Sequence, residues 1–93
     1  MKNKNLKEIR KKLDKVDVKL LRNIKIRSAL VDQVIRLKEN KKEIVDKKRI
    51  NFILKKIKRN SIRAKIDPMI TTYIWKAMIR AFIKYEYKNF KKK

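Results

Sequence analysis

Apolar residues in the first third of the chain recur at steps of three and four, with one longer gap. The residues that follow this spacing are Leu6, Ile9, Leu13, Val16, Leu20, Ile24, Val31 and Val34. Because an α-helix has about 3.6 residues per turn, they share one helix face, which we call the apolar stripe. The sequence therefore predicts one long helix over residues 4–38, whose start Asn3 or Asn5 can cap.

A second helix is predicted after a short interruption. Residues 39–45 break the apolar spacing, and Asn40 is a suitable C-terminal stop for the first helix in a chain without Gly. Asp46 can then cap a helix over residues 46–62, in which apolar residues return at helical spacing.

A third helix is predicted from a clear start signal. Asp67 is a typical capping residue and Pro68 suits the first helical position, so we expect a helix over residues 68–90. The tight turns of β-hairpins depend on Gly, which this chain lacks. We therefore expect an all-α fold of three helices in a single domain over residues 1–93.

The length of the first helix predicts a dimer. About 35 helical residues extend roughly 52 Å, whereas a compact chain of this size has a radius of gyration of only about 12 Å. Two shorter helices of the same chain cannot cover the whole apolar stripe. We therefore expect an obligate homodimer in which the two long helices pack along each other.

The net charge is strongly positive. Lys and Arg number 31 and Asp and Glu 9, which gives +22. A small basic helical protein that binds nucleic acid is therefore one alternative. Nucleic-acid readers rely more on Arg, however, and this chain has 23 Lys against 8 Arg. We expect most of the charge to lie on solvated helix faces, and no specific nucleic-acid partner.

Several residue types are missing, and their absence excludes many kinds of chemistry. Without Cys and His there is no disulfide, no zinc site built on those residues, and no Ser-His-Asp or Cys-His catalysis. Without Gly there is no phosphate-binding P-loop. We expect neither a metal nor a cofactor. No apolar run approaches the ~20 residues of a membrane span, so we expect a cytoplasmic protein without membrane contact.

Five charged residues fall on or beside the apolar faces. Arg27 and Lys38 are in register with the apolar stripe and Arg10 lies at its edge. Arg49 and Glu86 follow the apolar spacing of the second and third helices. A buried charge needs a partner because its desolvation is costly, although long side chains can also bury their stems and keep their charge in water. Four cations against one acid favour a small dianion, which Arg can grip in bidentate fashion.

The order and spacing of these five charged residues resemble those of the all-helical (AroQ-type) chorismate mutases of the proteobacterial type. The resemblance extends from Leu6 to about Tyr87. Arg27 follows Arg10 by 17 residues and Lys38 follows Arg27 by 11, as in that family. The segments that carry the resemblance are LKEIRKKLDKVDVKLL at 6–21, DKKR at 46–49, IDP at 66–68 and WKAMIRAFIKYE at 75–86.

The resemblance implies an intertwined homodimer of three-helix chains, which agrees with the dimer expected from helix length. It implies that Arg27 and Lys38 of one chain, with Arg10 of the partner subunit, hold the two carboxylates of chorismate. Lys38 and Glu86 would also address the ether oxygen, and Arg49 would line the site. Lys38, Glu86 and Arg27 are thus the predicted catalytic residues.

Two further residues are predicted to contact the substrate. Asp46 would lie near the ring hydroxyl by resemblance, although a helix cap explains an Asp at this position more simply. Phe82 would line the site, although Trp75, Met78 and Phe82 are more simply explained as core residues.

The implied reaction suits a chain that lacks Cys and His. Chorismate becomes prephenate, on the route to Phe and Tyr, by a unimolecular rearrangement that needs no nucleophile, metal or cofactor. The protein must hold the enolpyruvyl arm over the ring. It must also stabilise the negative charge that develops on the ether oxygen as the C–O bond breaks.

Two residues depart from the family pattern. Ile50 follows Arg49 where many members have Glu, so a side-chain acceptor for the substrate hydroxyl is missing. Glu86 stands where some members have Gln. An ionised Glu86 would repel the developing oxyanion, so we expect Glu86 to act protonated and activity to fall as pH rises. Isochorismate pyruvate lyase shares the fold and an apolar residue after the second-helix Arg, and is the closest alternative.

Overall fold

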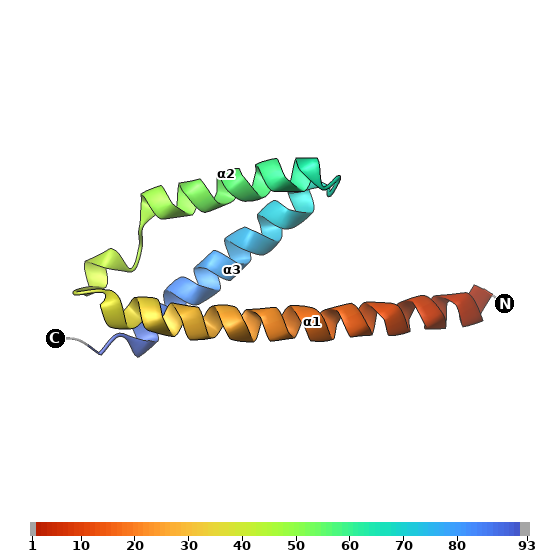
Figure 1. Cartoon of the computed structure of the whole chain (residues 1–93), viewed down its shortest axis with the longest axis horizontal. Helices are drawn as coiled ribbons and strands as arrows, with labels where there is room; N and C mark the ends of the chain where they lie inside the picture. Colours follow the sequence, from red (N-terminus) through yellow and green to blue (C-terminus); the bar gives the residue numbers. More distant parts are fainter. Residues whose placement is uncertain (1, 92–93) are drawn as a thin grey trace. The chain divides into compact units, whose positions relative to one another are not determined.

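The computed structural model describes the backbone of residues 2–91 and the side chains of residues 5–91. This part of the chain forms α1 (Lys2–Leu37), the short 3-10 helix η1 (Lys41–Glu43), α2 (Lys47–Arg63) and α3 (Pro68–Asn89) (Figure 1). It contains no strand, which confirms the all-α class. The bounds of the three long helices lie within two residues of those predicted from the sequence.

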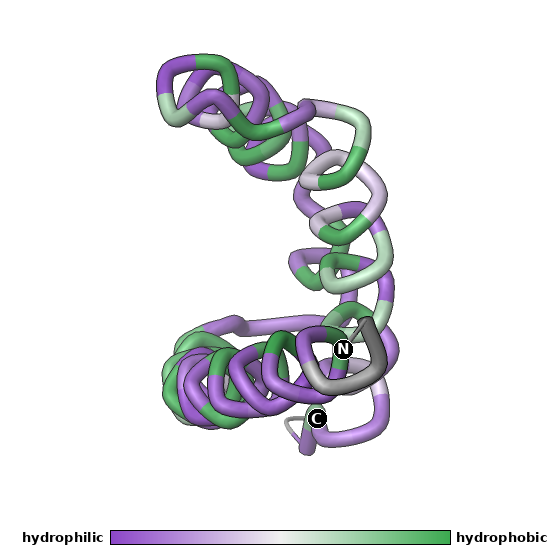
Figure 2. Tube along the Cα trace, turned by 90° about the vertical axis from the view of Figure 1, so that its right-hand side faces the viewer, coloured by the Kyte–Doolittle hydropathy of each residue, from purple (hydrophilic) through white to green (hydrophobic). Residues whose placement is uncertain are grey.

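The chain divides into two compact units, residues 1–30 and residues 31–93, and α1 contributes to both. In the first unit, every described side chain from residue 5 to residue 26 is exposed. Hydrophobic and hydrophilic residues are interleaved along the helices (Figure 2). Within this unit, from Leu6 to Ile24, the exposed fractions of the apolar stripe run from 45% at Leu6 to 56% at Leu13. The predicted amphipathic face is therefore present, and the first unit does not cover it.

The second unit contains a small core. α2 and α3 form a helical hairpin and pack against each other (Figure 1). The buried apolar residues are Ile35 near the end of α1, Ile44 directly after η1 and Ile79 in α3. Two polar residues, Ser61 and Glu86, are also buried. None of the described helices has the length and apolar character needed to cross a membrane.

Two of the predicted helix caps are present. The Asp46 carboxylate accepts a hydrogen bond from the backbone N–H of Arg49 at 3.0 Å, and the Asp67 carboxylate accepts one from Met69 at 2.9 Å. Each bond satisfies a backbone donor that lacks a partner within the first helical turn. Both caps fix where a helix begins, and Pro68 is the first residue of α3 as predicted.

The expectations for three Asn residues were wrong. Asn3 and Asn5 lie inside α1, which already begins at Lys2, so neither stands at the N-cap position. Asn40 does not end α1 in a left-handed conformation, because its φ of −149° is extended. Instead, its side chain accepts a hydrogen bond from the backbone N–H of Lys42 and caps η1. α1 ends three residues earlier, at Leu37.

The turn between α2 and α3 has the geometry that usually requires Gly. Lys65 has a φ of 59°, in the left-handed region. The N–H of Ile66 donates to the carbonyl of Ser61 at 2.9 Å, and that of Lys65 to the carbonyl of Ile62 at 3.1 Å. This pair of bonds is the Schellman motif, which ends many helices. Since the chain contains no Gly, a Lys occupies the strained position.

Candidate active site

The structure brings Lys38 and Glu86 together although they are 48 residues apart in sequence. Lys38 directly follows α1, and its backbone N–H still donates to the carbonyl of Val34 at 3.1 Å. Glu86 lies in the last turn of α3 and is only 8% exposed. The Lys38 Nζ and Glu86 Oε1 atoms are 2.9 Å apart, the distance of a charge-assisted hydrogen bond.

A second acceptor fixes the Lys38 ammonium. Its Nζ also donates to the backbone carbonyl of Ile44 at 3.4 Å, and Ile44 is one of the most buried residues of the second unit. An ammonium group has three N–H donors. Two are directed at Glu86 and Ile44, so Lys38 retains one donor for a ligand in a partly buried environment.

Arg49 and Asp46 lie at the start of α2, and both are exposed. The Asp46 carboxylate is engaged as the helix cap. The Arg49 guanidinium carbon lies 5.5 Å from the centroid of the Phe52 ring, within range of a cation–π interaction. The described contacts of both residues are local to α2, so the structure does not join them to the Lys38–Glu86 pair.

Phe82 is half-buried and lies one helical turn before Glu86. Its ring meets the ring of Tyr85 edge to face, with centroids 6.3 Å apart and an interplanar angle of 81°. Tyr85 in turn donates its hydroxyl to the Asp32 carboxylate at 2.6 Å. This hydrogen bond, together with burial and the charge of Asp32, raises the pKa of Tyr85 above 10.0.

Asp32 and Tyr85 were missed by the sequence analysis. The available signal was weak: Asp32 directly follows Val31 of the apolar stripe, and Tyr85 directly precedes Glu86. Both look like ordinary surface residues until the ends of α1 and α3 are placed side by side.

Arg10 and Arg27 belong to the first unit. Arg10 is exposed, and Arg27 is half-buried. They lie 17 residues apart on the same helix, which at 1.5 Å per residue separates them by about 25 Å along its axis. One copy of α1 therefore cannot bring both guanidinium groups onto one small ligand.

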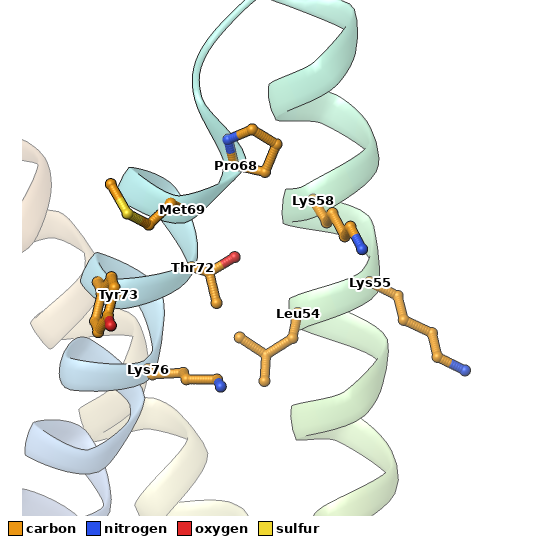
Figure 3. A pocket seen from close by; sticks show the side chains of 8 residues that line it. All are labelled: Leu54, Lys55, Lys58, Pro68, Met69, Thr72, Tyr73 and Lys76. Carbon is orange, nitrogen blue, oxygen red and sulfur yellow. The ribbon is translucent and has the colours of Figure 1, made fainter.

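A groove of about 630 Å³ runs between α2 and the first half of α3. Leu54, Thr72 and Lys76 point toward one another across it, whereas Lys55 extends away (Figure 3). None of the sequence-predicted site residues lines this groove. The lining residues are Leu54, Lys55, Lys58, Pro68, Met69, Thr72, Tyr73 and Lys76. Its lining combines apolar side chains with three lysines and contains no acidic residue, so it lacks the acid–cation pair of the candidate site.

Comparison with known proteins identifies the family. The sequence profile of the chorismate mutase type II family matches residues 9–87, which include every residue of the candidate site. No curated protein and no solved structure gives a significant match. The all-α architecture of the described residues agrees with the match. The chain therefore belongs to the chorismate mutase type II family, whose members are isomerases that act on chorismate.

Proposed function

We propose that Lys38 and Glu86 are the catalytic pair with which this chorismate mutase forms prephenate. The observation that carries the proposal is their 2.9 Å contact in a partly buried environment. Both can donate a hydrogen bond at neutral or lower pH, Lys38 as the ammonium and Glu86 when protonated. Such donors suit the reaction, because negative charge develops on the ether oxygen while the C–O bond breaks.

In this mechanism the ether oxygen lies within about 3 Å of both donors. Lys38 offers the N–H that its other two acceptors leave available, and the contact with Ile44 keeps the ammonium in place. Glu86 offers a proton from a nearly buried carboxyl group. Each preorganised donor contributes about 10²–10³ in rate, because it does not have to reorient during the reaction.

The substrate carboxylates are assigned to arginines. Arg27 would bind one carboxylate together with Lys38, and Arg10 of the partner subunit would reach the other. The separation of about 25 Å between Arg10 and Arg27 along one helix supports this assignment in trans. Arg49 is proposed to line the site, since its guanidinium lies at the start of the helix that Asp46 caps.

Asp46 and Phe82 are also proposed to contact the substrate. Because the Asp46 carboxylate already accepts the Arg49 N–H, a contact with the ring hydroxyl would use the Asp46 backbone. Phe82 is held against Tyr85 next to Glu86, so its ring can form an apolar wall.

A homodimer is supported by two surfaces that one chain leaves open. The apolar stripe of α1 is about half exposed from Leu6 to Ile24. The groove between α2 and α3 is also partly lined by apolar and aromatic side chains, among them Leu54 and Met69. A second copy of α1 would cover such surfaces, and burial of apolar area is the main source of free energy for association.

The first experiment measures prephenate formation from chorismate by the purified protein. We expect turnover, with kcat/KM reduced at least 10²-fold by Arg27→Ala or Lys38→Ala and with unchanged helical circular dichroism. Lys42→Ala, which removes an exposed cation of η1, is the matched control and should keep full activity. Pyruvate release from isochorismate without prephenate formation would instead assign the lyase activity. Full turnover by both site variants would refute the site.

A second experiment tests the assignment in trans. Arg10→Ala and Arg27→Ala are purified separately, mixed, unfolded and refolded together. Each parent should be inactive, whereas heterodimers contain one site with both arginines. Random pairing then restores about one quarter of wild-type activity, since half of the dimers carry one intact site of two. No recovery in a mixture that contains heterodimers would mean that a single chain supplies both arginines to each site, and would contradict the assignment in trans.

The location and the metabolic role complete the proposal. We propose that the enzyme acts in the cytoplasm and supplies prephenate for Phe and Tyr synthesis. We expect the wild-type chain to support growth of a mutase-deficient bacterium without added Phe and Tyr. We expect Lys38→Ala not to support it. Failure of the wild-type chain to support growth when it is expressed as an active enzyme would contradict this role.

A further inference from the structure

A second hydrogen bond joins the same two helix ends that carry the catalytic pair. Tyr85 of α3 donates to Asp32 of α1 at 2.6 Å, and Glu86 of α3 accepts from Lys38 at 2.9 Å. All four residues belong to the second unit. A bond of 2.6 Å between a hydroxyl and a carboxylate is in the range of strong charge-assisted hydrogen bonds.

The two bonds act at different points near the end of α1, one from Asp32 within the helix and one from Lys38 directly after it. Asp32 and Lys38 are six residues apart, which corresponds to about 9 Å along a helix axis. On α3, Tyr85 and Glu86 are adjacent and point about 100° apart around the axis. A single bond would leave the end of α3 able to pivot against α1. Two bonds that leave α3 in different directions fix its rotation, and with it the direction of the Glu86 carboxyl group.

Tyr85 is well suited to this task. Its ring is held edge to face by Phe82, and its hydroxyl is held by Asp32. The bond to Asp32 is the main reason that the pKa of Tyr85 is raised, so the hydroxyl keeps its proton across the working range of an enzyme. The hydrogen bond between Tyr85 and Asp32 therefore stays in place when Glu86 changes its hydrogen-bond partners on substrate binding.

We propose that Asp32 and Tyr85 are a positioning pair that aligns Glu86 with Lys38 for the rearrangement. This inference rests on the proposed catalytic roles of Lys38 and Glu86. The pair touches no substrate atom itself. It acts on the orientation of a donor, and misplacement of a catalytic group by about 1 Å can cost up to 10²-fold in rate.

The test compares kcat and KM for Tyr85→Phe, Asp32→Ala and Asp32→Asn. Tyr85→Phe and Asp32→Ala should each lower kcat about tenfold and leave KM within about twofold, because the arginines that bind the carboxylates are unchanged. The double variant should be no worse than either single variant, as expected for two residues that act through one contact. Asp32→Asn keeps an oxygen that accepts the Tyr85 hydroxyl, so it should keep kcat within about threefold of wild type.

Two controls separate positioning from stability. Tyr87→Phe removes the hydroxyl of an exposed Tyr two residues further along α3 and should leave kcat unchanged. Thermal unfolding is followed for every variant, and kcat is measured well below the lowest midpoint. A merely structural pair would lower the midpoint and leave kcat intact, and that outcome would overturn the proposal.

Lys38→Ala distinguishes failure of this inference from failure of the proposed function. If Lys38→Ala loses turnover while Tyr85→Phe keeps it, the positioning role is wrong and the catalytic pair stands. If Lys38→Ala itself keeps turnover, the catalytic pair is wrong, and the positioning role falls with it.

Discussion

The two parts of α1 have the same apolar spacing but different surroundings. Leu13, in the first unit, is 56% exposed, whereas Ile35, in the second, is 7% exposed. Ile35 belongs to the last turns of α1, where Asp32, and Lys38 directly after the helix, bind residues of α3. The comparison teaches that helical spacing identifies the face that needs cover, while the neighbouring elements decide whether the same chain provides it.

The charged residues show the same difference. Arg10 lies on the exposed part of α1, and Lys38 lies where α1 ends beside α3. Only Lys38 has a charged partner, Glu86, among the contacts described for these two cations. The second unit thus contains a preformed ion pair between Lys38 and Glu86, whereas the contribution of Arg10 to the site of another copy of the chain stays a prediction.

The largest predicted effect is the loss of dimerisation and activity when charges are placed on the exposed apolar stripe of α1. Leu13→Lys combined with Val16→Lys places two charges in the proposed dimer interface, and each buried charge without a partner costs several kcal/mol. We expect the variant to be monomeric and to retain less than about 1% of wild-type activity, since Arg10 no longer reaches the site. Analytical ultracentrifugation and the prephenate assay measure the two effects.

Val18→Lys is the matched control for this change. Val18 lies on the same helix at 57% exposure, but on the opposite side from the apolar stripe. It should leave the dimer and the activity intact. Equal damage by both changes would show that helix stability, rather than an interface, was lost. A double variant that stays dimeric and active would remove the proposed role of the stripe.

The second predicted effect is a pH dependence of activity that arises from Glu86 in the second unit. In the proposed mechanism a protonated Glu86 donates a hydrogen bond to the ether oxygen, so wild-type activity should fall as pH rises. The amide of Glu86→Gln donates a hydrogen bond at every pH, so the pH profile of this variant should be flat. At the alkaline end its kcat should exceed that of wild type by about tenfold, which is part of the effect expected for one complete donor. A wild-type profile that is flat from about pH 5 to about pH 9 would exclude a protonated Glu86.

The sequence allowed much of the fold to be predicted, because helices depend on local signals. The apolar spacing, the Asp46 cap and the Asp67–Pro68 start each act within a few residues, and all three agree with the structure. Asn40 was misjudged because an Asn can cap a following turn as well as end a preceding helix. The left-handed Lys65 was not foreseen, since a Lys carries no sequence signal for that conformation.

The candidate site could be predicted only in part. Lys38 and Glu86 could be singled out because both lie in register with apolar faces, and the structure brings them into contact, while their catalytic role stays a prediction. The contact between Asp32 and Tyr85 depends on the mutual rotation of α1 and α3, which no local pattern encodes. The placement of Arg10 and Arg27 in one site stays a prediction, because it requires a second chain.

A smaller predicted effect concerns the unfolding free energy. It compares the hydrogen bond from a Ser hydroxyl to a helix carbonyl in the two units. The hydroxyl of Ser61 donates to the carbonyl of Ile57 at 2.6 Å and lies 2.7 Å from the Thr71 hydroxyl, joining α2 to α3. Ser28 donates to the carbonyl of Ile24 at 2.9 Å in the first unit. Ser61→Ala should cost about 1 kcal/mol in unfolding free energy, because it removes the bond to the half-buried Thr71, whose hydroxyl keeps only its 3.3 Å bond to the carbonyl of Pro68.

Ser28→Ala is the matched change, with the same local bond and no link to another helix. It should cost less than about 0.5 kcal/mol, since Ala is the better helix former and the freed carbonyl keeps its helical hydrogen bond. Urea unfolding at fixed protein concentration measures both variants. Equal costs would mean that the link between Ser61 and Thr71 adds nothing to the hairpin.

The smallest predicted effect is a gain in stability at the turn between α2 and α3. Lys65 holds a φ of 59°, which costs an L-residue about 1–2 kcal/mol and costs Gly almost nothing. Part of that gain is offset because Gly is more flexible in the unfolded chain, so Lys65→Gly should stabilise by about 0.5–1 kcal/mol. Lys65→Ala is the control: it removes the same charge but keeps the Cβ atom, so it should give no comparable gain.

If Lys65→Ala stabilised as much as Lys65→Gly, relief of charge repulsion in a basic chain would be the cause. A gain confined to Gly would instead show that the turn of the second unit carries its own backbone strain. Because that strain lies within one chain, the gain in free energy should be the same at every protein concentration, unlike a weakening of the exposed face of α1.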